Sequence, residues 1–574
     1  MNNTITIEKP EPKGILRWLV LLIISMAMFG NYYVYDSISP LADLLSSQLG
    51  FKDSAIGLLQ GIYSIPNIFM VLIGGLIIDR IGTKKASLIF SSLCMIGAFF
   101  TAVQGNLVWM ATGRLIFGLG AESLIVAITT ILARWFKGKE LSFAFGLNLT
   151  IARLGSFAAL NSATWGKAFY SSWQSPLWVA FAAALVSVIA VILYFTTDTL
   201  AGKKYKLAPE GNQDKVILKD VLKFNKSFWF ITMLCVTFYS AMFPFQTFAV
   251  KFFINQHFTQ IPTGVGRSIG GFLSSLLTLS AMILTPLFGL LADKIGKRAT
   301  LMMFGSLLII PVYLIMNYAH TDKPIPENML EAINAKKEIV LQFCNDNNEA
   351  ILNIIDKAQN LVAENKNLDA LLTNFNSEQI QVIKTSLLAN VDNLKALENA
   401  KSILLSEANA SAHNLIDSLN LGNRVAVEIQ DNKLIFKDKE ELGFADLMRY
   451  YFNMIGLLFS YFPFLIFPMI MMGIAFSLIP AVMWPSVALI TEQSKLGTAY
   501  GMMTMIQNIG LSLFNLLIGS VNDLTGSYTL GMWIFSILGF LGFLFGFLLK
   551  KTDKAQGGFG LELSAKKKMQ INEK

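Results

Sequence analysis

Apolar residues occur along this chain in blocks separated by short polar segments. A helix needs about 20 apolar residues to cross the hydrocarbon core of a bilayer, so each block predicts one membrane span. The first half of the chain has blocks at 16–37, 54–78, 86–104, 108–133, 143–163 and 176–197. The second half has blocks at 228–253, 267–291, 299–317, 468–490, 497–520 and 529–549. The pattern therefore predicts an all-α membrane protein of twelve spans.

A long polar segment, residues 318–445, separates the ninth and tenth predicted spans. Apolar positions recur at helical spacing between 327 and 421, which predicts a few amphipathic helices. Residues 425–436 alternate around Asp431 and Asn432, which predicts a small hairpin. Residues 446–467 are aromatic and apolar but contain Pro463. We expect an interfacial segment there, because a thirteenth span would move the basic residues after the last span to the other side.

The composition agrees with a membrane protein. Hydrophobic residues make up 54% of the 574 residues and charged residues 15%, against roughly 25% charged residues in soluble domains. Lysine and arginine cluster after spans 2, 4, 6, 8 and 12, all on one side of a twelve-span chain. Basic loops stay in the cytoplasm, so both termini are expected there. This bias explains the net charge of +8 better than binding to nucleic acid does.

Little in the sequence points to catalysis. The cysteines (Cys94, Cys235 and Cys344) and the histidines (His257, His320 and His413) are few and scattered. This spacing argues against a disulfide framework and against a metal centre. We find no phosphate-binding glycine loop followed by lysine, and no serine or cysteine nucleophile beside a histidine. We therefore expect no enzyme, no cofactor and no ATP-driven pump.

A loop motif occurs twice, 214 residues apart. It runs Gly75-x-x-x-Asp79-Arg80-Ile81-Gly82-Thr83-Lys84-Lys85 and again Gly289-x-x-x-Asp293-Lys294-Ile295-Gly296-Lys297-Arg298. A generic basic turn would explain one copy, whereas two copies in register predict two related six-helix bundles. Contacts made by such motifs could hold the two bundles together when the outer side is open.

Two charged residues lie near the middle of adjacent spans, Glu122 in span 4 and Arg153 in span 5. A charge at the bilayer centre costs roughly 2.5–3.5 kcal/mol on insertion scales. One interpretation is a static ion pair that joins the two spans. The other is that both face a central cavity, where Glu122 holds a substrate ammonium and Arg153 a substrate carboxylate. A small zwitterion would suit the second arrangement.

Further polar and aromatic residues in the spans are candidates for the same cavity, although each alone is more often a packing residue. The candidates are Tyr35, Phe245, Trp484, Gln507 and Asn508. The two amides are the strongest among them, because a mid-span amide needs a hydrogen-bond partner. Arg114, nearer the outer part of span 4, is expected to be structural.

The repeated motif resembles the loop 2–3 signature of the major facilitator superfamily and its copy at loop 8–9. Span 4 adds a second resemblance, to the Arg-x-x-x-Gly-x-Gly motif of that superfamily, through Arg114, Gly118 and Gly120. The runs 118–123, 135–156, 483–488 and 496–510 are similar to the lysosomal dipeptide transporter branch. That resemblance implies the two-bundle facilitator fold and dipeptide uniport, with Glu122 and Arg153 at the positions of a charged pair that grips the peptide termini.

The insert departs from the family pattern, and the tail shows no sorting signal; both favour a bacterial inner-membrane relative over a lysosomal protein. The resulting division is a six-helix bundle at 1–200, a cytoplasmic linker at 201–227, spans 7–9 at 228–317, an extracytoplasmic insert at 318–445, an interfacial segment at 446–467, spans 10–12 at 468–551 and a cytoplasmic tail at 552–574.

Alternatives remain open at this stage. A proton-coupled symporter of an organic anion, using Glu122 or Asp36 as the protonatable group, is a second interpretation. A sensor or scaffold that recruits a protein partner through the acidic insert, whose net charge is −7 over 318–441, is a third.

Overall fold

The computed structural model describes residues 10, 12–136, 140–205, 224–259, 261, 263–320, 402, 406, 408–414, 425–430, 433–438, 444–492, 495–555 and 558–563. The chain divides into two compact units. One comprises Met1–Thr259, Gly266–Asp322 and Leu458–Lys574; the other comprises Gln260–Val265 and Lys323–Leu457.

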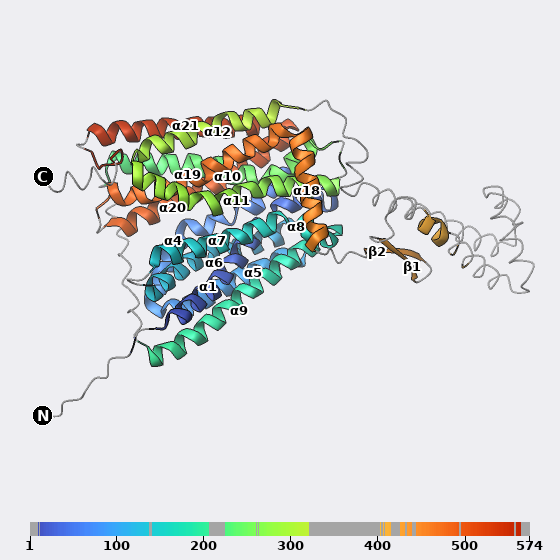
Figure 1. The fold of residues 1–574 in the computed structure, drawn as a ribbon, viewed down its shortest axis with the longest axis horizontal. Coiled ribbons are helices and arrows are strands. Elements are labelled where there is room, and N and C mark those ends of the chain that lie inside the picture. The colour runs from blue at the N-terminus through green and yellow to red at the C-terminus, as the bar shows by residue number, and fades with distance from the viewer. Residues whose placement is uncertain are drawn as a thin grey trace, which may run out of the picture. The chain divides into compact units, whose positions relative to one another are not determined.

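The first half of the larger unit is a bundle of helices, shown in blue to teal in Figure 1. Its members are α1 (Gly14–Asp36), α2 (Ala42–Leu49), α3 (Asp53–Gly61), α4 (Ser64–Ile81), α5 (Thr83–Val103), α6 (Leu107–Trp135), α7 (Leu141–Leu160), α8 (Ser162–Trp165) and α9 (Gln174–Lys204). Two short 3₁₀ helices, η1 (Ser39–Leu41) and η2 (Lys167–Ser171), connect them. We call these helices the first bundle.

The second bundle follows after the linker. Its helices are α10 (Lys226–Gln256), α11 (Thr263–Ile295), α12 (Arg298–Tyr318), α19 (Pro463–Ile490), α20 (Leu496–Thr525) and α21 (Thr529–Ala555). Twelve stretches in the described chain are long and apolar enough to cross a membrane, with α3 and α4 together making the second. The predicted twelve-span fold in two bundles is therefore confirmed.

One predicted boundary is wrong. The tenth span begins at Pro463 rather than at 468, so the last residues of the predicted segment 446–467 belong to α19. Proline is favoured in the first turn of a helix because its missing N–H has no partner there in any case. The rest of that segment lies in a separate helix, α18 (Phe444–Tyr461), and its interfacial position stays a prediction.

The smaller unit contains the predicted hairpin. Strands β1 (Val425–Gln430) and β2 (Lys433–Asp438) pair antiparallel, with Val425 opposite Asp438 and Gln430 opposite Lys433. This confirms the hairpin expected over 425–436. Most of the helices predicted between 327 and 421 lie outside the described residues, and so does the proposed recruitment of a partner by the insert.

Small residues let the helices of the first bundle approach closely. A side chain at Gly97 of α5 would collide with the backbone of Gly113 and Phe117 on α6, and one at Gly113 would collide with Thr101. Close backbone contact at glycines is typical of helix pairs in membranes, where dispersion between helices replaces the hydrophobic effect.

Because the number of spans is even, α1 begins and α21 ends on the same face of the larger unit (Figure 1). We call this the terminal face. The connections α1–α2, α10–α11 and α20–α21 lie at the opposite face.

Candidate functional site

Glu122 lies on α6 and is half-buried. The hydroxyl of Tyr63, at the junction of α3 and α4, donates a hydrogen bond of 3.0 Å to its Oε1. Among the ion pairs of the described residues, none joins Glu122 to Arg153. In this state, the two mid-span charges do not form the static pair that was one of the two interpretations.

Arg153 lies on α7 with its guanidinium between two aromatic rings. Its Cζ is 5.3 Å from the ring centre of Tyr32 on α1 and 5.2 Å from that of Phe476 on α19. Both are cation–π distances. No hydrogen bond connects the Arg153 side chain to another described part of the chain. The N–H groups are thus available to an oxyanion, at a point where both bundles meet.

The same region is lined by aromatic side chains from both bundles. Tyr35 on α1 lies 4.9 Å from the ring of Tyr63 and 6.0 Å from that of Phe243 on α10. Trp484 on α19 donates its indole N–H to the hydroxyl of Tyr239 over 3.1 Å. Tyr35 and Trp484, both predicted from the sequence, therefore belong to an aromatic zone that extends across the two bundles.

The other predicted residues are placed differently. Phe245 is 2% exposed and packs on Tyr313 and Phe535 inside the second bundle, so it is a core residue in this structure and does not join the candidate site. Gln507 is half-buried and accepts a long hydrogen bond from the Cys235 thiol. Asn508 is fully buried and bonds to the carbonyl of Thr504 on its own helix. The structure does not connect either amide to Glu122 or Arg153.

Arg114 is saturated by backbone. It is 1% exposed and donates to the carbonyls of Val34, Tyr35 and Leu59 and to the side chain of Gln60. These contacts tie α6 to the ends of α1 and α3, and they agree with the structural role expected for this arginine.

The repeated motif lies at the terminal face, where Asp79, Arg80, Lys85 and Lys294 are exposed. Gly82 and Gly296 adopt positive φ, 82° and 67°, which only glycine accepts without strain. Gly75 is half-buried on α4. The ion pairs of the described residues at this face stay within one bundle: Arg17–Glu140, Lys84–Asp198, Arg134–Asp198, Arg298–Asp293, Lys495–Glu492 and Lys550–Glu562. No latch between bundles is formed by these pairs.

The opposite face is cross-linked between the bundles. Arg267 on α11 grips both carboxylate oxygens of Asp43 on α2, with its Nε 2.9 Å from Oδ1. Lys251 on α10 binds Asp53 on α3 and donates to Ser46. Together with Asp523 of α20, these charged residues form what we call the opposite-face cluster.

Asp523 strengthens the cluster by capping a helix. Its carboxylate accepts from the backbone N–H groups of Asp53 and Ser54 at the start of α3, at 2.8 and 2.9 Å. Asn522 adds a bond to the Asp53 carboxylate. Anions are favoured at helix N-termini because the first N–H groups have no partner within the helix. The structure therefore has its opposite face closed. Sequence analysis missed this cluster, although Asp43 in an apolar stretch and Lys251 at a span end were available signals.

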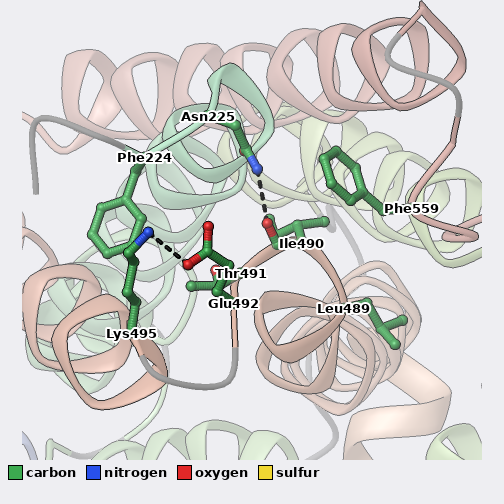
Figure 2. A pocket seen from close by; sticks show the side chains of 8 residues that line it. All are labelled: Phe224, Asn225, Leu489, Ile490, Thr491, Glu492, Lys495 and Phe559. Carbon is green, nitrogen blue, oxygen red and sulfur yellow. Dashed lines mark hydrogen bonds and ion pairs between the residues drawn. The ribbon is translucent and has the colours of Figure 1, made fainter. Parts of the chain in front are cut away.

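A separate pocket opens at the terminal face of the second bundle (Figure 2). Its volume is about 370 Å³, and it is lined by Phe224, Asn225, Leu489, Ile490, Thr491, Glu492, Lys495 and Phe559. Asn225 donates to the carbonyl of Ile490, and Lys495 pairs with Glu492. The pocket shares none of these residues with the Glu122 and Arg153 region.

Twelve spans in two bundles, with charged and aromatic residues between them, define a membrane transporter rather than an enzyme. The chain belongs to the Major Facilitator Superfamily: residues 22–325 match the model of that family, and residues 249–569 match that of the MFS_1 like family. The recognition made from the loop motifs is thereby confirmed.

Relatives with known roles share part of the chain. The human lysosomal dipeptide transporter MFSD1 is 33% identical over 296 residues, which cover 49% of this chain and 62% of the relative. The match thus spans less than two thirds of that relative. The probable sulfoacetate transporter SauU of Cupriavidus necator is 25% identical over 160 residues, 27% of this chain and 37% of the relative. The crystal structure of the nucleoside transporter NupG covers 93% of this chain and 99% of its own, with a TM-score of 0.57 and 13% identity, and it supports the fold alone.

Proposed function

We propose that this protein carries dipeptides, or zwitterions of similar size, across a membrane by alternating access as a uniporter. The observation that carries the proposal is the Arg153 guanidinium. It has no hydrogen-bond partner among the described residues and is held between rings from both bundles. Tyr32 interacts electrostatically with both Arg153 and Glu122, which puts a cation and an anion at the same part of the bundle. The partial match to the human dipeptide transporter supports the same substrate class.

The chemistry follows from the two side chains. A substrate carboxylate accepts paired N–H bonds from Arg153, a geometry for which guanidinium is better suited than ammonium. The substrate ammonium lies against the Glu122 carboxylate, whose Oε1 already accepts from Tyr63. A ligand with both charges neutralises the two mid-span groups at once, and this offsets the cost of holding them away from water.

The direction of the molecule in its membrane is part of the proposal. The basic loops and both chain ends lie at the terminal face, which we assign to the cytoplasm by the positive-inside rule. The closed opposite face then faces outward, and the bound membrane is a bacterial inner membrane. The structure accordingly represents the state that exchanges substrate with the cytoplasm.

The test is uptake of a labelled dipeptide by the purified protein in liposomes. Glu122→Gln and Arg153→Lys should each lower uptake about tenfold or more, since a hydrogen bond to a charged group contributes about 1.5–3 kcal/mol. Glu492→Gln and Arg17→Lys make the same changes at the terminal face and should keep wild-type uptake. Wild-type rates in both site variants would exclude this site.

A second candidate, a proton-coupled symporter of an organic anion, has its own support. Asp36 is a buried carboxylate near the end of α1, and no ion pair of the described residues involves it. SauU, a probable sulfoacetate transporter, is a partial relative. Uptake measured with and without an imposed pH gradient decides between the two. Equal uptake in both conditions rules out coupling, and stimulation of anion but not dipeptide uptake favours the symporter.

A further inference from the structure

Tyr63 directly contacts the proposed amine-binding group. Its hydroxyl donates to Glu122 Oε1 over 3.0 Å, and Glu122 has no other hydrogen bond within the described residues. A carboxylate accepts through two oxygens, so this bond leaves Oε2 free. A glutamate with one oxygen held by a buried phenol loses fewer rotamers when it takes a ligand than an unrestrained one does.

The backbone of Tyr63 is itself fixed. Pro66 has no N–H to give to the carbonyl of Ile62, and that carbonyl instead accepts a short bond from Ile65, which separates α3 from α4 at this point. On α6, Gly118 packs directly on the carbonyl of Tyr63 and on the Pro66 ring. The helix break places Tyr63 where a regular helix would not.

The ring of Tyr63 is also packed on both sides. It lies 4.9 Å from Tyr35 and 5.7 Å from Phe117. Tyr35 in turn lies 6.0 Å from Phe243 of the second bundle, and the guanidinium of Arg114 is 6.0 Å from its ring. The Glu122 carboxylate is thus connected through aromatic contacts to the interface between the bundles.

We propose that Tyr63 is a positioning residue that orients Glu122 so that its free oxygen meets the ammonium group of the substrate. This role rests on the proposed function and deepens it. It makes the Tyr63 hydroxyl matter for ligands that carry an α-ammonium and not for ligands that lack one. A purely structural hydroxyl would affect both kinds of ligand equally.

The experiment compares Tyr63→Phe with the matched control Tyr313→Phe, using a dipeptide and its N-acetyl form as competitors of labelled dipeptide uptake in liposomes. Tyr313 also has a buried hydroxyl, which donates to the carbonyl of Ala241 inside the second bundle. Tyr63→Phe should raise the inhibition constant of the free dipeptide about tenfold and leave that of the N-acetyl form unchanged. Tyr313→Phe should shift neither constant relative to the other.

A double-mutant cycle separates the two claims. With Glu122→Gln present, adding Tyr63→Phe should cause no further loss, because residues that act through one interaction are not additive. A wild-type response of Tyr63→Phe, equal losses on both ligands, or additive losses overturn the positioning role while the Glu122 site stands. An unchanged dipeptide constant in Glu122→Gln overturns the amine site itself, and with it the role of Tyr63. The thermal midpoint of each variant shows that it is folded.

Discussion

Two arginines in adjacent spans show how one residue type takes two roles. Arg114 donates to carbonyls in the last turns of α1 and α3, which have no partner within their own helices. A cation at helix C-termini is also favoured by the helix dipole. Arg153 lies between two rings and uses none of its donors within the described chain. Saturation marks the structural arginine, and free donors mark the candidate ligand group.

A single histidine at the opposite face makes stability depend on pH. His257, just after α10, is 9% exposed, its Nε2 lies 2.8 Å from the carbonyl of Met316, and its ring packs on Phe464. Burial, and secondly the nearby His320, lower the pKa of His257 from 6.5 to about 4. The folded protein therefore keeps this ring neutral in a pH range where the unfolded chain protonates it.

Because the unfolded state binds the extra proton, the contribution of His257 to stability is complete above about pH 6.5 and is lost as the pH falls towards 4. The thermal midpoint should fall between pH 7 and pH 5 in the wild type and fall less in His257→Asn. His413→Asn, at an exposed histidine, should keep the wild-type slope. Parallel slopes for wild type and His257→Asn would contradict the assignment.

At the scale of elements, the junction of α3 and α4 determines where the candidate site lies. Pro66 interrupts the hydrogen bonding of the second span, and Gly118 allows α6 to approach the junction. A side chain at Gly118 would overlap the carbonyl of Tyr63 and lie 2.7 Å from the Pro66 ring. The superfamily-like glycine of span 4 is thus required by a helix contact next to the site.

Gly118→Ala should therefore destabilise the protein, since overpacking costs about 1–3 kcal/mol, and should weaken dipeptide uptake by moving Tyr63. Gly146→Ala on α7 is the matched control, because a side chain there meets nothing within 4 Å. In that variant the midpoint should be equal to or above that of the wild type, as alanine favours the helix by about 1 kcal/mol. Equal midpoints for the two variants in detergent would show that the contact at Gly118 is not tight.

At the scale of the whole molecule, the two faces differ in how the bundles are joined. Within the described residues, ion pairs between bundles lie at the opposite face, whereas those at the terminal face stay inside one bundle. An open opposite face requires the separation of Asp43 from Arg267 and of Asp53 from Lys251. The opposite-face cluster therefore stabilises only the state seen here.

Arg267→Met should shift the population towards the state open at the opposite face. Breaking a buried ion pair by removing one partner costs about 3–5 kcal/mol, and that cost falls on the closed state. Spin labels at Ser47→Cys and Leu524→Cys, both exposed and in different bundles, should report a larger fraction of long distances.

Two comparisons test that shift. The exchanged pair Asp43→Arg with Arg267→Asp should restore the short distances, and Arg298→Met, which breaks a pair within the second bundle, should leave the distribution as in the wild type. A wild-type distribution in Arg267→Met would mean that the cluster does not hold the face closed.

The sequence by itself determined the spans, their grouping into two bundles and the family. A run of about 20 apolar residues in a bilayer satisfies its backbone only as a helix, so local composition is sufficient for each span. It also found Glu122, Arg153 and Arg114, because charges inside spans are rare. Only the tertiary structure decided that Phe245 is a core residue, that Tyr63 holds Glu122, and that the opposite face is closed. Those facts depend on pairs such as Asp43 and Arg267, 224 residues apart, and no local pattern encodes which distant side chains the packing of two bundles brings together.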